Sequence, residues 1–158
     1  MNAKDVIRGL LPIAAAGYLA IAPSTDALAS DAEPAIATTA GDPALKWGPC
    51  PDFLPAGCAI AVLHGDPSQP NADVYFKVPA RSEIALHTHT SAERMVLVAG
   101  ELEVTYQGQA PARLTPGAYA YGPAGRPHGG RCTSDVPCIL FIAFESAVDA
   151  MPTPAASP

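Results

Sequence analysis

The sequence is poor in charge and has no basic cluster. Only 15% of its 158 residues are charged, and the formal net charge is −6. Without a stripe of lysine and arginine, the chain has no surface suited to nucleic acid. It also contains no phosphate-binding loop, no recognisable sugar-binding pattern and no internal repeat. The length predicts one domain, and the composition argues against nucleic acid as a partner.

Long uninterrupted segments are missing as well. The 18 prolines and 13 glycines interrupt the chain too often for long helices and favour short strands joined by turns. The expected strands are 58–64, 73–78, 84–89, 94–99, 101–106, 112–114, 118–121, 128–133 and 138–145. Strands at this spacing, with turn residues between them, predict an all-β sandwich or barrel.

The N-terminal apolar run, residues 10–22, is too short for a membrane span. Lys4 and Arg8 precede it, and an Ala-Leu-Ala cleavage site ends at Ala29. These features predict a secretory signal peptide, and therefore a periplasmic or secreted mature chain without a membrane span. A retained membrane anchor and a cytosolic N-terminal helix are the alternatives.

Three of the four histidines lie in two short windows. His87 and His89 point the same way if they lie on a strand, because strand side chains alternate between faces. Glu93 follows a short polar stretch, and a tight turn there would bring its carboxylate over both imidazoles. His128 arrives from a distant strand after a Pro-Ala-Gly-Arg-Pro corner. Three nitrogens and one oxygen suit Mn, Fe, Co or Ni with two open positions, or Zn or Cu at lower coordination.

The spacing of both windows resembles the two motifs of the cupin superfamily. The first reads His-X-His, three residues, Glu, six residues, Gly100; the second reads Gly117, five residues, Pro-X-Gly, two residues, His128. The resemblance is to small single-domain bacterial cupins and covers about residues 47–145. It implies a jelly-roll barrel, or double-stranded β-helix, with His87, His89, Glu93 and His128 as metal ligands, and it raises the possibility of a homodimer.

Two positions depart from the cupin pattern. Arg81 stands where the first motif usually opens with glycine, and Cys132 stands where the second often closes with asparagine. On an unbroken strand Cys132 shares a face with His128, so a free thiol near the metal is one hypothesis. A disulfide is the favoured alternative.

The four cysteines form two close pairs. We expect the local pairings Cys50–Cys58 and Cys132–Cys138, each closing a short loop, although three connectivities are possible. Disulfides agree with an oxidising compartment. The expected organisation is a signal peptide at 1–29, a disordered linker at 30–44, the cupin barrel at 45–149 and a disordered tail at 150–158.

The residue pattern assigns no general acid or base. Candidates for proton donation or substrate contact are Tyr75, Tyr119 and Tyr121, and candidates for binding a substrate carboxylate are Arg81 and Arg126. His64 is a candidate for a supporting position behind the metal ligands. Core packing is the commoner role for a barrel tyrosine, and solvated positions are commoner for the arginines and His64.

One divalent transition metal (Fe, Mn, Ni, Zn or Cu) and a small-molecule partner are therefore expected. The resemblance implies an enzyme acting on a small oxygen-containing molecule, either a dioxygenase or a Lewis-acid isomerase or lyase. A non-catalytic exported module that binds a metal or small molecule is the alternative, because this fold hosts many functions.

Overall fold

The computed structural model describes residues 33–154, so the expected signal peptide lies outside the described residues. The strands are β1 Trp47–Pro49, β2 Ala59–His64, β3 Asp73–Val78, β4 Glu83–Thr88, β5 Glu93–Ala99, β6 Leu102–Tyr106, β7 Ala112–Leu114, β8 Tyr119–Gly122, β9 His128–Cys132, β10 Cys138–Phe144 and β11 Met151–Pro152. Within this range, no helix is long and apolar enough to cross a membrane.

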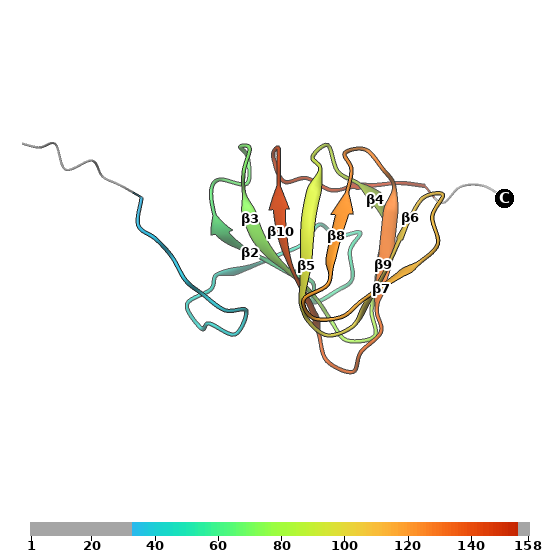
Figure 1. Cartoon of the computed structure of the whole chain (residues 1–158), viewed down its shortest axis with the longest axis horizontal. Coiled ribbons are helices and arrows are strands. Elements are labelled where there is room, and N and C mark those ends of the chain that lie inside the picture. The colour runs from blue at the N-terminus through green and yellow to red at the C-terminus, as the bar shows by residue number, and fades with distance from the viewer. Residues whose placement is uncertain (1–32, 155–158) are drawn as a thin grey trace, which may run out of the picture. The chain divides into compact units, whose positions relative to one another are not determined.

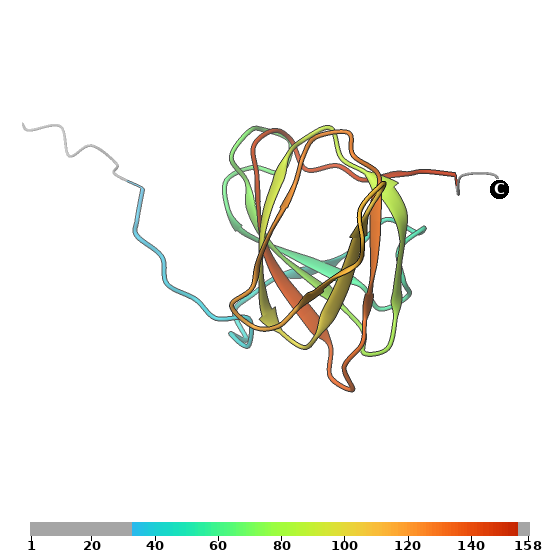
Figure 2. The ribbon, with the colours of Figure 1, turned by 45° about the vertical axis from the view of Figure 1, so that its right-hand side comes forward.

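The strands form two antiparallel sheets that face each other (Figure 1). One has the order β1-β2-β3-β10-β5-β8, and the other has the order β11-β4-β9-β6-β7. From β3 onward the chain changes sheet at every connection except that between β6 and β7, and Figure 2 shows both sheets curving around an interior. The predicted all-β jelly-roll barrel is confirmed.

Alternation of side chains builds the core. Every second residue of β10 is buried, including Leu140 and Ile142, and β5 repeats the pattern with Met95 and Leu97. The buried faces of the two sheets meet in one apolar cluster. Each such side chain contributes about 1.5–3 kcal/mol to stability when removed from water.

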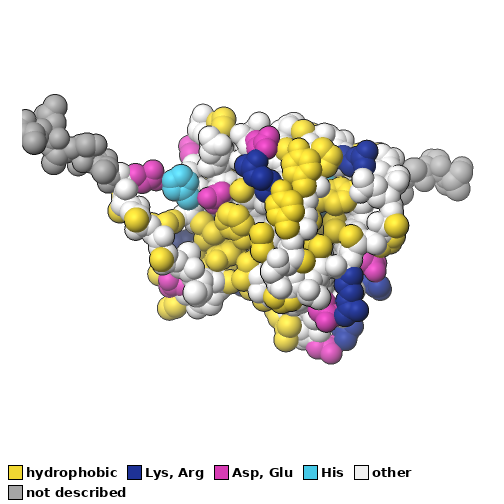
Figure 3. All heavy atoms as spheres, viewed as in Figure 1, with side chains coloured by type: hydrophobic (Ala, Val, Ile, Leu, Met, Phe, Trp, Pro, Cys, Tyr) yellow, Lys and Arg dark blue, Asp and Glu magenta, His cyan; other side chains and the backbone are white. Residues whose placement is uncertain are grey.

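The outer face of the six-stranded sheet is also largely apolar. The strand register places one residue from each strand in a row: Trp47, Ala61, Tyr75, Phe141, Val96 and Tyr119. Figure 3 shows apolar side chains gathered over this sheet, with Tyr119 60% exposed at its edge strand.

Both disulfides of the structure join neighbouring cysteines. Cys50 is bonded to Cys58 and Cys132 to Cys138, the two local pairings expected from the sequence. Cys132 is fully buried and has no free thiol, so the hypothesis of a thiol at the metal is wrong.

Arg81 adopts a left-handed backbone conformation, with φ of 57°. Glycine favours this conformation, and other residues adopt it at a cost of about 1–2 kcal/mol. The turn before β4 is therefore kept although the usual glycine is absent. The guanidinium pairs with Asp135 at 2.7 Å and donates to the carbonyl of Thr133, which ties this turn to the β9–β10 loop.

The C-terminal residues differ from the expected tail. Met151 and Pro152, placed in a disordered tail from the sequence, form β11 and pair with Thr88 and His87. The amide of Thr153 also donates to the carbonyl of Leu86 at 3.0 Å. Without β11, β4 would expose an unpaired edge, and an edge strand is a position that tolerates proline.

Candidate metal centre

Both sheets contribute to the histidine cluster. His87 lies in β4 and His128 begins β9, and these two residues are Cα partners in the five-stranded sheet. His89 follows the end of β4, and Glu93 begins β5 in the opposite sheet. All four side chains are buried, with Glu93 only 2% exposed. The structure thus brings together the four residues that the two sequence windows single out.

Their ligand atoms converge. Nε2 of His87 lies 3.1 Å from Nε2 of His89, and the available nitrogens of the three histidines lie within 4.8 Å of one another. The two carboxylate oxygens of Glu93 reach different rings: Oε2 lies 3.6 Å from Nε2 of His89, and Oε1 lies 3.0 Å from Nε2 of His128. The cluster offers three nitrogens and one carboxylate to one point.

Backbone carbonyls fix the orientation of the three rings. Nδ1 of His87 donates to the carbonyl of Ala85 at 2.7 Å, and Nδ1 of His128 donates to that of Arg126 at 3.1 Å. Nδ1 of His89 donates to the carbonyl of Asp149. In each neutral ring the proton is therefore on Nδ1, and Nε2 presents a lone pair. Three Nε2 lone pairs and one carboxylate that face one point suit a cation, and carbonyl partners of this kind orient metal-binding histidines.

The pKa values of His87 and His128 are shifted by burial and by the neighbouring groups of the cluster. Burial, followed by the neighbouring His128, lowers the pKa of His87 to about 4. Burial also opposes charging of His128, but the Glu93 carboxylate outweighs it and raises the pKa of His128. Oε1 of Glu93 lies 3.0 Å from Nε2 of His128, and no other group within residues 33–154 pairs with this buried oxygen. The donor set fits a divalent transition metal.

Gly122 makes room for the carboxylate. It is the Cα partner of Glu93 across β5 and β8. A Cβ atom at this position would lie 2.6 Å from Oε1 and 2.8 Å from Cγ of Glu93. Any side chain at this position would displace the carboxylate.

A C-terminal strap, residues 145–153, contacts the segment that joins His89 to Glu93. The amides of Glu145 and Ser146 donate to the buried hydroxyl of Ser91 at 2.9 and 2.8 Å. The carboxylate of Asp149 accepts hydrogen bonds from the amide of Thr90 at 2.9 Å and from its hydroxyl at 2.6 Å. The strap therefore holds the segment between His89 and Glu93 at several points.

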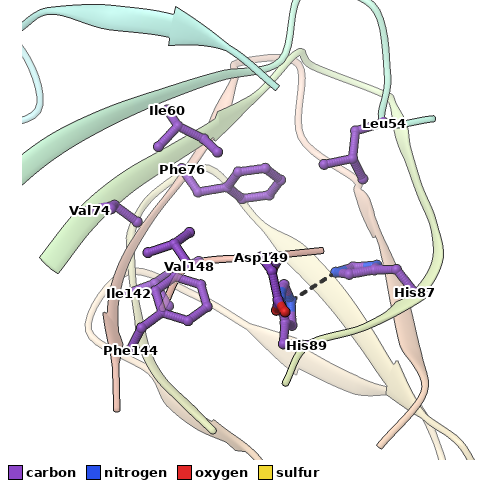
Figure 4. Close-up of a pocket in the computed structure, with 10 residues that line it drawn as sticks. All are labelled: Leu54, Ile60, Val74, Phe76, His87, His89, Ile142, Phe144, Val148 and Asp149. Carbon is purple, nitrogen blue, oxygen red and sulfur yellow. Dashed lines mark hydrogen bonds and ion pairs between the residues drawn. The ribbon is translucent and has the colours of Figure 1, made fainter. Parts of the chain in front are cut away.

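Two small apolar cavities adjoin His87. The first, of about 50 Å³, is lined by Leu54, Ile60, Val74, Phe76, His87, His89, Ile142, Phe144, Val148 and Asp149. Figure 4 shows the two imidazoles on one side of it and the apolar side chains around the remainder. The second, of about 40 Å³, lies between His87 and His128 and the core around Met95 and Leu140. One water needs about 10–15 Å³, so each cavity holds only a small group.

The other candidates from the sequence lie elsewhere. His64 is exposed at the end of β2 and is not part of the histidine cluster. Tyr119 and Tyr121 are 60% and 49% exposed on β8, and Tyr75 lies on the outer sheet face. Arg81 pairs with Asp135, and Arg126 contributes its carbonyl to His128.

Sequence reasoning missed three residues near the centre. Asp149 and Gly122 contact the ligands from distant strands or loops, and Tyr106 packs beside His128 at a ring distance of 5.2 Å. Only the register, with Tyr106 opposite His128, reveals this last neighbour.

Comparisons with known proteins agree with this architecture. Residues 74–144 match the family model described as the cupin domain. The chain is 32% identical over 104 residues to dimethylsulfoniopropionate lyase DddQ from Ruegeria pomeroyi strain DSS-3, covering 64% of this chain. It spans 51% of that relative, about half of its length.

Solved structures give the same result. The crystal structure of the Ruegeria pomeroyi lyase superimposes with a TM-score of 0.61 at 25% identity, over 72% of this chain and 64% of the other. An RmlC-like cupin from Shewanella frigidimarina has a TM-score of 0.56 at 21% identity, over 67% and 87% of the two chains. A cupin-2 domain from Rhodospirillum rubrum has a TM-score of 0.61 at 16% identity, over 77% and 83%. The chain therefore carries a small domain of the cupin superfamily.

Proposed function

We propose that the protein is a metal-dependent enzyme acting on a small oxygen-containing molecule. One divalent transition metal would be held by His87, His89, Glu93 and His128. The observation that carries this proposal is the convergence of three buried Nε2 lone pairs on one buried carboxylate. When bound, the metal supplies Lewis acidity to a substrate oxygen. Iron, manganese, nickel, zinc and copper all suit these ligands.

The surrounding residues support the binding of a small substrate. The aliphatic and aromatic walls of the first cavity exclude water and so strengthen electrostatic interactions at the centre. Neither lysine nor arginine lines that cavity, and Asp149 is the one acidic residue in its wall. The part of the substrate that enters the cavity is therefore compact and apolar, or cationic.

Lyase chemistry is favoured over the dioxygenase alternative. The relative from Ruegeria pomeroyi is a lyase acting on dimethylsulfoniopropionate. We infer that this chain acts on a related small carboxylate, with dimethylsulfoniopropionate as the first compound to test. Its sulfonium group would suit a cavity that contains the rings of Phe76 and Phe144, because aromatic faces attract cations.

The proposal includes export and partners. The two disulfides support a periplasmic or secreted location, with the signal peptide ending at Ala29. The apolar row on the six-stranded sheet is the surface through which a homodimer would form.

An exported module that binds a metal or metabolite without turnover is the second candidate function, supported by the small size of both cavities.

Metal analysis of the purified protein tests the centre directly. We expect about one transition metal per chain in the wild type, and loss of that metal in the His87→Ala/His128→Ala variant. His64→Ala is the matched control, because this exposed histidine is outside the cluster. Equal metal content in the double variant would refute the site. Product formation from dimethylsulfoniopropionate would then separate an enzyme from a binding module.

A further inference from the structure

Tyr106 carries a buried hydroxyl that has no hydrogen-bond partner among the described residues. Its side chain is 7% exposed, and the described residues contain only two such unpaired buried side-chain oxygens, this hydroxyl and Oε1 of Glu93. Buried tyrosine hydroxyls usually find a partner, because an unpaired donor loses the hydrogen bonds that it makes in water. A donor that the described part of the chain leaves unpaired inside the barrel therefore indicates a partner such as a water or a bound ligand.

The position of Tyr106 relates this hydroxyl to the metal centre. Tyr106 ends β6 and is the Cα partner of His128 in β9. The two rings are 5.2 Å apart and inclined by 37°. A phenol is protonated at neutral pH and so can donate a hydrogen bond. The Tyr106 side chain and the Glu93 carboxylate thus lie next to the same histidine.

We propose that the Tyr106 hydroxyl donates a hydrogen bond to an oxygen atom of the ligand bound at this centre, and is therefore a catalytic residue of the enzyme. The inference rests on the proposed function. The ligand oxygen belongs to a carboxylate or an enolate, the groups on which negative charge resides or develops beside a Lewis acid. A donor fixed in a buried position stabilises such charge without reorganising during the reaction.

This role separates Tyr106 from the other tyrosines. Tyr119 and Tyr121 are exposed on β8, and Tyr75 lies on the outer face of the six-stranded sheet. Tyr75 is nevertheless as buried as Tyr106, with 9% exposure against 7%. Tyr75→Phe is therefore a matched control for Tyr106→Phe, since each removes one oxygen from a buried ring.

The test uses the mature protein loaded with Co²⁺, and acetate is the carboxylate probe. Acetate binding is followed through the visible spectrum of Co²⁺. We expect Tyr106→Phe to take up Co²⁺ as the wild type does, but to bind acetate about tenfold more weakly, the loss typical of one hydrogen bond to a charged acceptor. Tyr75→Phe should bind acetate with unchanged affinity.

Stability of the metal-free proteins gives a second readout. Because no group that the structure describes pairs with the Tyr106 hydroxyl, we expect its removal to leave the urea midpoint unchanged or raise it. A hydroxyl with a structural role would instead lower the midpoint on removal. The two readouts together separate a ligand contact from a folding contact.

Several results would overturn the inference. Equal acetate affinity in Tyr106→Phe and wild type would do so while leaving the metal centre intact, and is also the result expected if the hydroxyl only holds a resident water. A lowered urea midpoint, or no acetate binding by the wild type, would overturn it as well. Failure of the wild type to take up more Co²⁺ than His87→Ala/His128→Ala would instead overturn the proposed function, and this inference with it.

Discussion

The backbone carbonyl of Asp149 accepts a hydrogen bond from Nδ1 of His89, sixty residues earlier in the sequence. The same aspartate binds the amide and the hydroxyl of Thr90 through its carboxylate. One residue of the C-terminal strap therefore sets both the tautomer of a candidate ligand and the backbone next to it. Outer contacts of this kind commonly change metal affinity by about 10–100-fold.

We predict that Asp149→Ala and Thr90→Val each weaken metal binding by about tenfold, because both release the chain beside His89. Asp149→Ala removes both hydrogen bonds and Thr90→Val removes only that of the hydroxyl, so the double variant should lose little more than Asp149→Ala alone. Metal affinities from competition with a chelator measure this. Asp66→Ala, which removes a similar local contact to Ser68, is the control. Fully additive losses would contradict a shared contact.

Gly122→Ala should disable the centre while leaving the barrel folded. The added methyl group would meet Glu93 at 2.6–2.8 Å and displace its carboxylate. We expect loss of at least tenfold in metal affinity with a native circular dichroism spectrum. Gly48→Ala, whose new methyl would lie 3.9 Å from its nearest neighbour, should retain wild-type affinity. Unchanged metal binding in Gly122→Ala would show that Glu93 is not required.

The low pKa of His87 predicts acid sensitivity of the metal-free protein. The folded value is about 4, whereas the unfolded chain titrates near 6.5. Between these values the unfolded state binds a proton that the folded state does not, so the free energy of unfolding falls as the pH falls. The contribution is complete above pH 6.5, and roughly 3 kcal/mol is lost on approaching pH 4.

His128 opposes this slope only above its unfolded pKa of about 6.5. Its folded pKa is raised, so its contribution is complete below the unfolded value and is lost only as the pH rises through the folded value. Urea unfolding at pH 7 and pH 5 checks the prediction, with His87→Gln as the comparison. The variant should lose clearly less stability than the wild type between these two pH values. Parallel losses would contradict the assigned role of His87.

The left-handed backbone at Arg81 predicts different stabilities for two substitutions at this position. Arg81→Gly removes the left-handed strain together with the pair to Asp135, and we expect the two effects to cancel within about 1 kcal/mol. Arg81→Val removes the same pair and places a β-branched residue at positive φ, so we expect it to be less stable by roughly 2 kcal/mol. Chemical denaturation measures both variants. Equal stabilities would show that the backbone conformation changes with the side chain.

The fold and the histidine cluster follow from local sequence patterns. Alternating apolar residues and frequent turns predict the strands, and the spacing of His87, His89 and Glu93 predicts their shared direction. The contacts around them depend on strand register, which a single sequence does not contain. Tyr106, Gly122 and Asp149 reach the centre because β6, β8 and the C-terminal strap lie next to it in space. The short strand β11 was also not predicted from the sequence, because two residues are too few to show a periodic pattern.

The strands that pair with β4 determine at which stage of synthesis the candidate metal ligands come together. This strand pairs with β9 on one side and β11 on the other, both from the last third of the chain. A growing polypeptide that has produced His87 and His89 therefore lacks the strands that hold β4 and the carbonyl that orients His89. An incomplete set of ligands selects poorly between metals, so the metal that it binds depends mainly on affinity and on which cation is abundant. Here all the strands and contacts that orient the four side chains exist only after residue 152 has been made, so any cation that binds this centre would enter it late in folding.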